Sequence, residues 1–466
     1  MTISTPPAPA GPCPRRPRRM RDELRELTVR LHFLAGLFIA PFLLVTAVTG
    51  VLYALTPQIE QMVYAEELHA TTCAQAEATP LAQQVRVGQA AVPDGTVAEI
   101  RPAPEAGSTA RVSFESPSAP EDRRLTTFVD PCTGEVTGVL PTFGEWLPLR
   151  TWFDDLHRNL HLGDAGRWYS EVAASWLWVL ALSGLAVWLT RKRRKRSLRA
   201  LLLAQRTGPR RQRAVSLHAT LGVWAALGLF FLSATGLTWS QYAGGNVGAL
   251  RQSLDWSTPS VSTQAHAGAP VAPVGEQRVP EVAQHMLEDS RAHGLADPVA
   301  ITPGADGGAW VVSQVQRSWP LQQDSVSLDP ATGQVLDSVR FEDWPVAAKF
   351  AEAGISFHMG IFFGWVNQLV LIGIAAAAIV LIVLGARLWW RRRPPAPDRG
   401  LPRPLGRPGR SAGAYGIMLA VAALAGLALP LLGLTLVLFL ALDLARQLLL
   451  ARRTSGRGRR APNLEP

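Results

Sequence analysis

Long apolar runs alternate with polar stretches along the chain. Four of these runs are close to the roughly 20 residues that a helix needs to cross a bilayer. They cover residues 33–55, 172–190, 217–240 and 365–390. A fifth apolar block, 412–450, is too long for one crossing at about 1.5 Å per residue, and Pro430 interrupts it. We predict a hairpin of two short spans there and about six transmembrane helices in total; the alternative for this block is one long kinked helix.

Two long polar regions separate the spans, and each has the pattern of a small α+β domain. A helix pattern comes first and alternating strand patterns follow. These segments lie at about 80–91 and 110–115 in the first region, and at about 280–293 and 309–314 in the second. Each region also contains Asp-Pro-x-Thr-Gly, which begins at Asp130 and at Asp329. Proline presets φ and glycine permits a positive φ, so the motif predicts a tight turn between two strands.

Basic residues gather on one side of the predicted spans. The chain has 46 Lys and Arg against 36 Asp and Glu, which gives a net charge of +10. Of the basic residues, 32 lie in four clusters at 15–30, 191–213, 387–410 and 446–460. By the positive-inside rule this side is cytoplasmic, so we expect both termini inside and both polar regions outside. The charge therefore indicates membrane topology, with membrane lipid as the partner and no nucleic acid.

The first and third spans are copies of one sequence. Residues 29–36, Val-Arg-Leu-His-x3-Gly, match residues 215–222, Val-Ser-Leu-His-x3-Gly, at an offset of 186. His32 therefore corresponds to His218, and both lie at cytoplasmic span ends. Thr-Gly follows each histidine, as Thr49-Gly50 and Thr235-Gly236.

The second and fourth spans also match each other, at an offset of 201. His157 falls on His358, and Gly184 falls on Gly385. Both histidines precede their spans on the external side, whereas His161 has no counterpart. The repeated unit is therefore a span, an external region and a second span.

Four duplicated histidines are the strongest candidates for a functional site. An imidazole inside lipid is costly and marks such a site by default. Two neutral imidazoles suit the axial positions of a b-type haem, whereas a zinc site needs three or four ligands. We predict two haems, one held by His32 and His218 and one by His157 and His358. The alternative is that these are ordinary interfacial residues. Cys-x-x-Cys-His is absent, which excludes covalent attachment.

Other polar residues near the span ends have supporting roles in this interpretation. Arg30, Arg158 and Arg167 could hold haem propionates through charge-assisted hydrogen bonds. His161 is an alternative ligand, or a residue that orients a propionate or substrate. Glu171 is either a proton relay or a polar residue of a helix start.

Two cysteines, Cys73 and Cys132, lie in the first external region. We predict a disulfide between them, since external disulfides persist; the alternative is two free thiols.

These motifs, in their order and spacing, resemble the PepSY-associated transmembrane family over roughly residues 25–392. Besides the histidine spans, the resemblance rests on Leu156-His157-Arg158-x-Leu160, on Ser183-Gly184 with Trp188, and on the Asp-Pro-x-Thr-Gly turns. Members resemble ferric-siderophore reductases of the bacterial inner membrane, which hold haem b between helices. The resemblance implies axial roles for the four histidines, although Met359 stands where the first copy has Arg158.

The resulting prediction is an α-helical integral membrane protein with two small PepSY-like periplasmic domains. It would pass electrons through two haems to an extracytoplasmic ferric siderophore. No nucleotide-binding fingerprint follows a strand, so we expect a separate cytoplasmic or quinol electron donor. Two rival functions remain: a periplasmic binding or regulatory protein without redox activity, and a component of an iron-chelate transporter.

The predicted domain boundaries follow from the same patterns. They are a disordered tail 1–24, spans 25–55, 157–190, 214–240 and 358–392, periplasmic domains 56–156 and 241–357, cytoplasmic segments 191–213 and 393–411, a C-terminal hairpin 412–450 and a tail 451–466.

Overall fold

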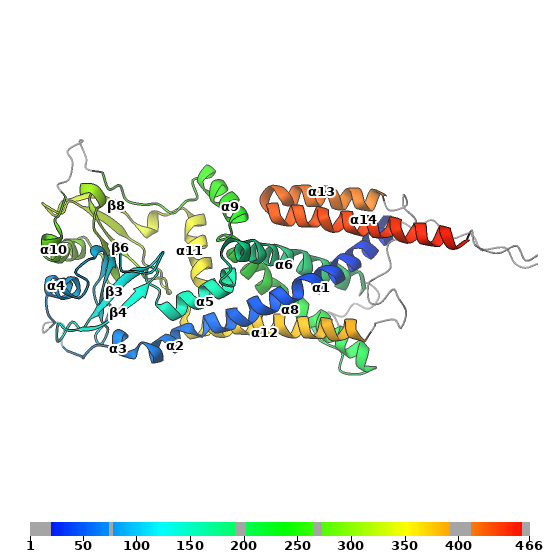
Figure 1. Ribbon diagram of the computed structural model, residues 1–466, viewed down its shortest axis with the longest axis horizontal. Coiled ribbons are helices and arrows are strands. Elements are labelled where there is room, and N and C mark those ends of the chain that lie inside the picture. The colour runs from blue at the N-terminus through cyan, green and yellow to red at the C-terminus, as the bar shows by residue number, and fades with distance from the viewer. Residues whose placement is uncertain (1–19, 74–77, 192–201, 265–272, 392–411, 459–466) are drawn as a thin grey trace, which may run out of the picture. The chain divides into compact units, whose positions relative to one another are not determined.

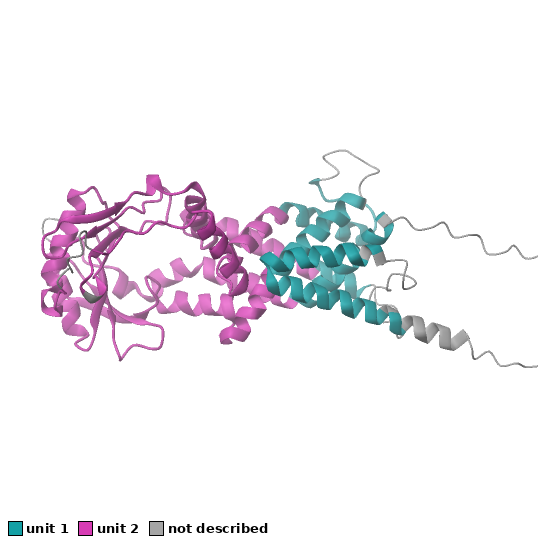
Figure 2. Ribbon diagram, turned by 90° about the horizontal axis from the view of Figure 1, so that it is seen from above, with its two compact units in different colours: residues 1–40, 175–224, 384–466 teal, residues 41–174, 225–383 magenta. Residues whose placement is uncertain are grey.

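The computed structural model describes residues 20–73, 78–191, 202–264, 273–391 and 412–458. The predicted tail 1–19, the linker 393–411, the end of the chain from 459, and residues 192–201 of the basic segment lie outside the described residues. The predicted tail residues 20–24 are helical. The chain forms two compact units (Figure 2). Unit 1 comprises 1–40, 175–224 and 384–466, and unit 2 comprises 41–174 and 225–383.

Four helices are long and apolar enough to cross a membrane. They are α1 (Met20–Ala54), α6 (Gly163–Arg191), α8 (Arg210–Leu237) and α12 (Gly364–Trp390). Each covers one of the four predicted apolar runs to within three residues, and each contributes residues to both units.

The prediction of about six transmembrane helices is wrong. The C-terminal block does form a hairpin, with α13 (Ala412–Ala428) and α14 (Pro430–Gly458) on either side of Leu429. However, the 17 residues of α13 extend only about 26 Å, which is less than a bilayer core of about 30 Å. Asp443 and Arg446 interrupt the apolar part of α14. The described residues therefore contain four candidate spans.

Shorter helices in unit 2 connect the spans to a β-sheet. They are α2 (Thr56–Val63), α3 (Ala65–Leu68), α4 (Leu81–Ala91), α5 (Pro148–Asn159), α9 (Tyr242–Ser253), α10 (Val279–Ala292) and α11 (Val346–His358). Three single-turn 3₁₀ helices lie at Glu276–Arg278, Ala305–Gly307 and Phe341–Asp343. Helix α5 begins at Pro148 and ends two residues after His157. Helix α11 begins directly after Pro345 and ends at His358.

The eight strands of unit 2 form one antiparallel sheet in the order β4-β3-β2-β1-β5-β6-β7-β8. The first copy supplies β1 (Thr96–Arg101), β2 (Ala110–Glu115), β3 (Arg124–Val129) and β4 (Val136–Thr142). The second copy supplies β5 (Val299–Thr302), β6 (Trp310–Gln314), β7 (Ser325–Leu328) and β8 (Val335–Val339). The strand and helix segments predicted from the sequence are confirmed within two residues.

The prediction of two small α+β periplasmic domains is corrected by this sheet, which joins the two copies. Strand β1 pairs with β5 at Ile100 and Ile301, and both side chains are fully buried. Helices α4 and α10 lie side by side next to the sheet (Figure 1) and share one hydrophobic core with strands of both copies. An unpaired β1 or β5 would expose a row of backbone donors and acceptors. Joining the two edges removes that cost, which a single copy cannot do alone.

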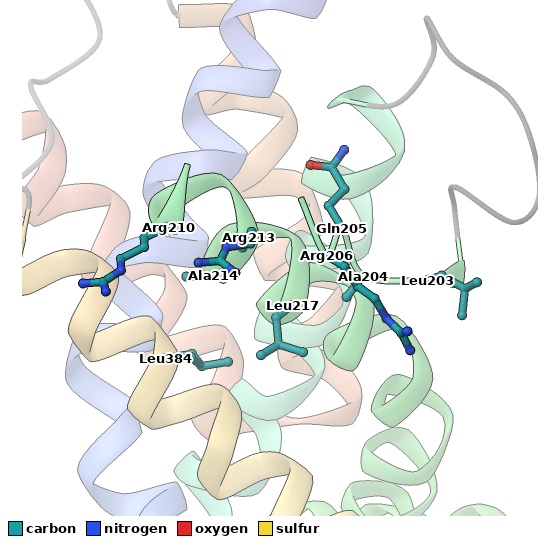
Figure 3. A pocket seen from close by; sticks show the side chains of 9 residues that line it. All are labelled: Leu203, Ala204, Gln205, Arg206, Arg210, Arg213, Ala214, Leu217 and Leu384. Carbon is teal, nitrogen blue, oxygen red and sulfur yellow. The ribbon is translucent and has the colours of Figure 1, made fainter. Parts of the chain in front are cut away.

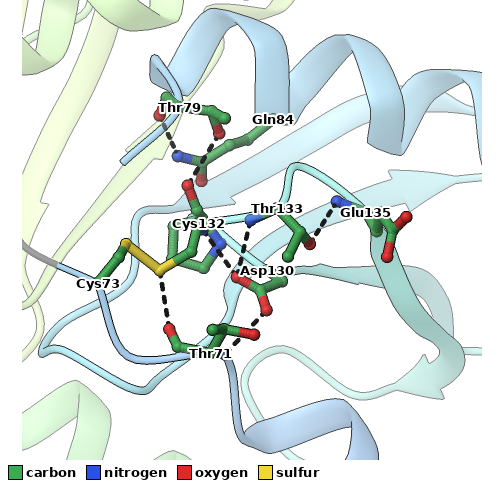
Figure 4. The surroundings of a disulfide bond; sticks show 9 residues. Thr71, Cys73, Thr79, Gln84, Asp130, Cys132, Thr133 and Glu135 are labelled. Carbon is green, nitrogen blue, oxygen red and sulfur yellow. Dashed lines mark hydrogen bonds between the residues drawn. A yellow bond between two sulfur atoms is a disulfide. The ribbon is translucent and has the colours of Figure 1, made fainter. Parts of the chain in front are cut away.

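The Asp-Pro-x-Thr-Gly turns form as predicted in both copies. Asp130 Oδ1 accepts hydrogen bonds from the backbone N–H groups of Cys132 (2.7 Å) and Thr133 (3.3 Å). Gly134 has a φ of +71° and its counterpart Gly333 has +70°, which explains the glycine in the motif. Cys132 of the first turn is bonded to Cys73, so the predicted disulfide is confirmed (Figure 4).

Candidate functional site

His32 of α1 and His218 of α8 lie close together in unit 1. Their ring centroids are 6.4 Å apart and the ring planes are inclined at 74°. The Nδ1 atom of His32 lies 3.1 Å from the backbone oxygen of Leu180 and 3.0 Å from Ser183 Oγ. A carbonyl oxygen can only accept, so Nδ1 of His32 carries the proton. Its Nε2 atom therefore keeps a lone pair that can bind a metal.

His157 of α5 and His358 of α11 form the second set, in unit 2. Thr49 Oγ1 lies 3.0 Å from His157 Nδ1, and Thr235 Oγ1 lies 2.6 Å from His358 Nδ1. Each threonine hydroxyl donates to a backbone oxygen four residues earlier in its own helix. The hydroxyl must then accept from the Nδ1–H group of the imidazole. This arrangement again leaves Nε2 as the atom available to a metal.

A glycine of another helix faces each of the four imidazoles. A Cβ atom added to that glycine would lie 3.0–3.6 Å from the Cε1 atom of the ring. The pairs are Gly184 with His32, Gly385 with His218, Gly50 with His157 and Gly236 with His358. Glycine allows the ring, and a flat group bound to it, to approach the neighbouring backbone closely.

The sequence analysis missed the roles of the residues that support the histidines. Thr49 and Thr235 orient an imidazole, and the glycine after each threonine accommodates it. The signal lay in the repeats, because Thr-Gly recurs at the offset of 186 and the Gly184–Gly385 match occurs at the offset of 201. Ser183 has Leu384 at its repeat position, so the second copy has no hydroxyl group at the position that contacts His32 in the first.

Burial keeps the two histidines outside the spans neutral. Loss of hydration lowers the pKa of His157 to about 4. It lowers the pKa of His358 to about 3, with the charge of His157 as a second cause. Both rings are therefore neutral at neutral pH, with a single ring proton, which is the form that binds a metal through the other nitrogen.

The spacing of His32 and His218 would allow both imidazoles to bind one metal ion placed between them. An imidazole nitrogen binds a metal at about 2 Å, so two rings on opposite sides of one ion have centroids about 6 Å apart. The observed 6.4 Å agrees with that requirement. Among the described residues, no group of three or more His, Cys, Asp or Glu is arranged to hold a metal ion directly.

The predicted propionate arginines lie in three different environments. Arg30 is buried and forms an ion pair with Asp443 of α14, within unit 1. Arg158 pairs with Asp154 and Asp155 on its own helix, at 3.7 and 3.4 Å. The Arg167 side chain is half-buried, with no hydrogen bond or ion pair to a described residue.

His161 and Glu171 have contacts that the sequence analysis did not anticipate. The His161 ring is exposed and lies 5.0 Å from the ring of Trp152, with a backbone φ of +55°. Glu171 is fully buried and accepts hydrogen bonds from the backbone N–H groups of Tyr242 and Ala243, both at 3.0 Å. These two donors begin α9, so Glu171 caps that helix from α6.

The four spans, the duplicated histidines and the single sheet define a multi-pass membrane protein with an internal repeat. More specifically, the chain belongs to the family of the PepSY-associated TM region, whose model matches residues 29–392. This match confirms the resemblance drawn from the motifs. No curated protein matches the chain.

Proposed function

We propose that the protein transfers electrons across the membrane through two b-type haems and reduces an extracytoplasmic acceptor. The observation that carries the proposal is the 6.4 Å spacing of the His32 and His218 rings, each next to a glycine of another span. The repeat of the same chemistry at His157 and His358 supports a second haem. A bound haem supplies one-electron transfer, and the protein sets its position and surroundings.

Each supporting contact has a definite task in this proposal. The Leu180 carbonyl and the hydroxyl groups of Ser183, Thr49 and Thr235 hold Nδ1 of a histidine, which fixes the tautomer and points Nε2 at the iron. A bilayer core of about 30 Å is too thick for one haem to bridge. Two haems, one near each end of the spans, divide this thickness into shorter steps of electron transfer.

Replacing Thr235 by valine tests the orienting role directly. Valine keeps the shape of threonine but cannot accept the Nδ1–H bond of His358. We expect the affinity of that site for haem to fall about 10- to 100-fold, as for other residues that orient metal-bound histidines. Haem titration of the apoprotein measures it. Thr238→Val is the matched control, because that hydroxyl bonds only to the Thr235 carbonyl among the described residues. Equal affinities for the two variants would contradict the role.

The acceptor that the family resemblance favours is ferric iron in a siderophore. The reaction takes one electron per iron and forms ferrous iron, which hard oxygen ligands hold less tightly. The electron comes from a separate donor, either a cytoplasmic reductant or a quinol.

Proteoliposomes provide the test of the function. Dithionite is enclosed in the vesicles, a ferric hydroxamate chelate is added outside, and an external ferrous-specific chelator reports the product. We expect wild-type vesicles to form ferrous iron and His218→Ala vesicles to match protein-free vesicles. His293→Ala, at the exposed end of α10, is the control and should keep the wild-type rate. Wild-type vesicles that form no ferrous iron would reject electron transfer, and uptake of the intact chelate would favour a transporter.

A further inference from the structure

An open pocket of about 960 Å³ lies at the Arg210 end of α8, within unit 1 (Figure 3). Its walls come from the segment before α8, from the first two turns of α8, and from Leu384 of α12. The segment is attached to α8 at two points. The backbone N–H of Gln205 donates to Ser216 Oγ, and Trp224 Nε1 donates to the Leu202 carbonyl, both at 3.0 Å. The pocket is therefore built by specific contacts.

Three arginines line this pocket, namely Arg206, Arg210 and Arg213. All three are exposed, and none has a hydrogen bond or ion pair to a side chain in the part of the chain that the structure describes. Guanidinium groups bind phosphate through paired hydrogen bonds. The pocket thus presents three positive charges that no carboxylate of the described residues pairs with.

The apolar part of the lining includes three leucines, Leu203, Leu217 and Leu384. Arg210 is the first residue of a candidate span, and Leu384 lies six residues before the end of another. The pocket is therefore at the level where lipid headgroups meet the ends of the spans. A ligand that suits it carries a phosphate next to an aliphatic chain.

We propose that this pocket binds an anionic phospholipid, with its headgroup among the arginines, whose side chains extend in different directions (Figure 3), and its acyl chain along the leucines. Basic pockets between transmembrane helices on the cytoplasmic side bind anionic headgroups in this way. The positive-inside distribution of the chain assigns the pocket to that side. The proposal needs no haem and does not rest on electron transfer.

Native mass spectrometry of the full chain in detergent tests the proposal. Lipid-depleted protein is mixed with equal amounts of phosphatidylglycerol and phosphatidylcholine, and the bound lipids are counted. We expect wild type to retain one phosphatidylglycerol in preference to phosphatidylcholine. We expect R210Q to bind phosphatidylglycerol about fivefold more weakly, because each arginine near an anionic headgroup strengthens binding by about that factor. The triple variant R206Q/R210Q/R213Q should therefore bind it about a hundredfold more weakly.

The matched control is R21Q/R25Q/R391Q, which removes three exposed arginines near the ends of α1 and α12, outside the pocket. It should keep the bound phosphatidylglycerol to within twofold. Equal losses in the two triple variants would overturn the proposal, because charge alone would then explain binding. Equal retention of the two lipids by wild type would also overturn it. So would loss of haem from the pocket variant with lipid binding unchanged, since the arginines would then serve the group held at His218.

Discussion

Alanine in place of His218 is expected to remove one haem and to leave the other in place. The variant loses one of the two rings that approach to 6.4 Å in unit 1, whereas the contacts of His157 and His358 lie in unit 2 and stay unchanged. The haem content, measured as the pyridine haemochromogen, should fall from two per chain to one. The reciprocal variant His358→Ala should also retain one haem, with a different reduction potential.

His161→Ala is the control for this experiment. That ring is exposed and contacts Trp152, so the variant should keep both haems. Loss of both haems from His218→Ala, or of neither, would contradict the pairing. Loss of a haem from His161→Ala would make His161 a ligand, as the sequence analysis allowed.

Asparagine in place of Asp443 is expected to destabilise unit 1 by about 3–5 kcal/mol, the usual cost of removing one partner of a buried ion pair. The side chains of Arg30 and Asp443 are 4% and 2% exposed, so the guanidinium charge would lose its carboxylate away from water. Thermal unfolding of the purified protein in detergent should show a clearly lower midpoint. Tyr415→Phe removes the hydroxyl that donates to the same carboxylate but leaves the ion pair in place, and should cost about 1 kcal/mol.

The double variant Arg30→Met/Asp443→Leu separates charge from packing. It removes both charges and keeps apolar volume, so stability should return to near the wild-type value. A double variant as unstable as Asp443→Asn would show that packing, and not charge, explains the loss.

The ion pair of Asp443 is one of the polar contacts by which the C-terminal hairpin binds the rest of unit 1. Besides Asp443, its Thr435 accepts a hydrogen bond from Trp176 Nε1 at 2.8 Å, so α14 satisfies polar groups of α1 and α6 within unit 1.

The features that the sequence predicted well depend on local pattern or on duplication. Apolar runs marked the four spans, and proline with glycine marked the two turns. The offset of 186 related His32 to His218, and the structure brings these two rings together. Repeat-equivalent positions were informative because the same chemistry at the same place in two copies is unlikely to be ordinary core packing.

The features that the sequence could not predict depend on contacts between distant segments. Strand β1 alternates like any half-buried strand, and nothing local shows that Ile100 pairs with Ile301 across some 200 residues. The ion pair of Arg30 joins it to Asp443, more than 400 residues later, so nothing local in the sequence indicates it. The apolar block 412–450 was counted as two spans because composition does not show how a hairpin packs.

The measurement that tests the account most directly is the haem content and ligation of the purified wild-type protein from haem-replete cells. We predict two haems per chain by pyridine haemochromogen assay. In the oxidised protein, low-temperature electron paramagnetic resonance should show low-spin signals of iron with two imidazole ligands. A folded protein that contains no haem, or whose iron is high-spin with a single histidine ligand, would contradict the account.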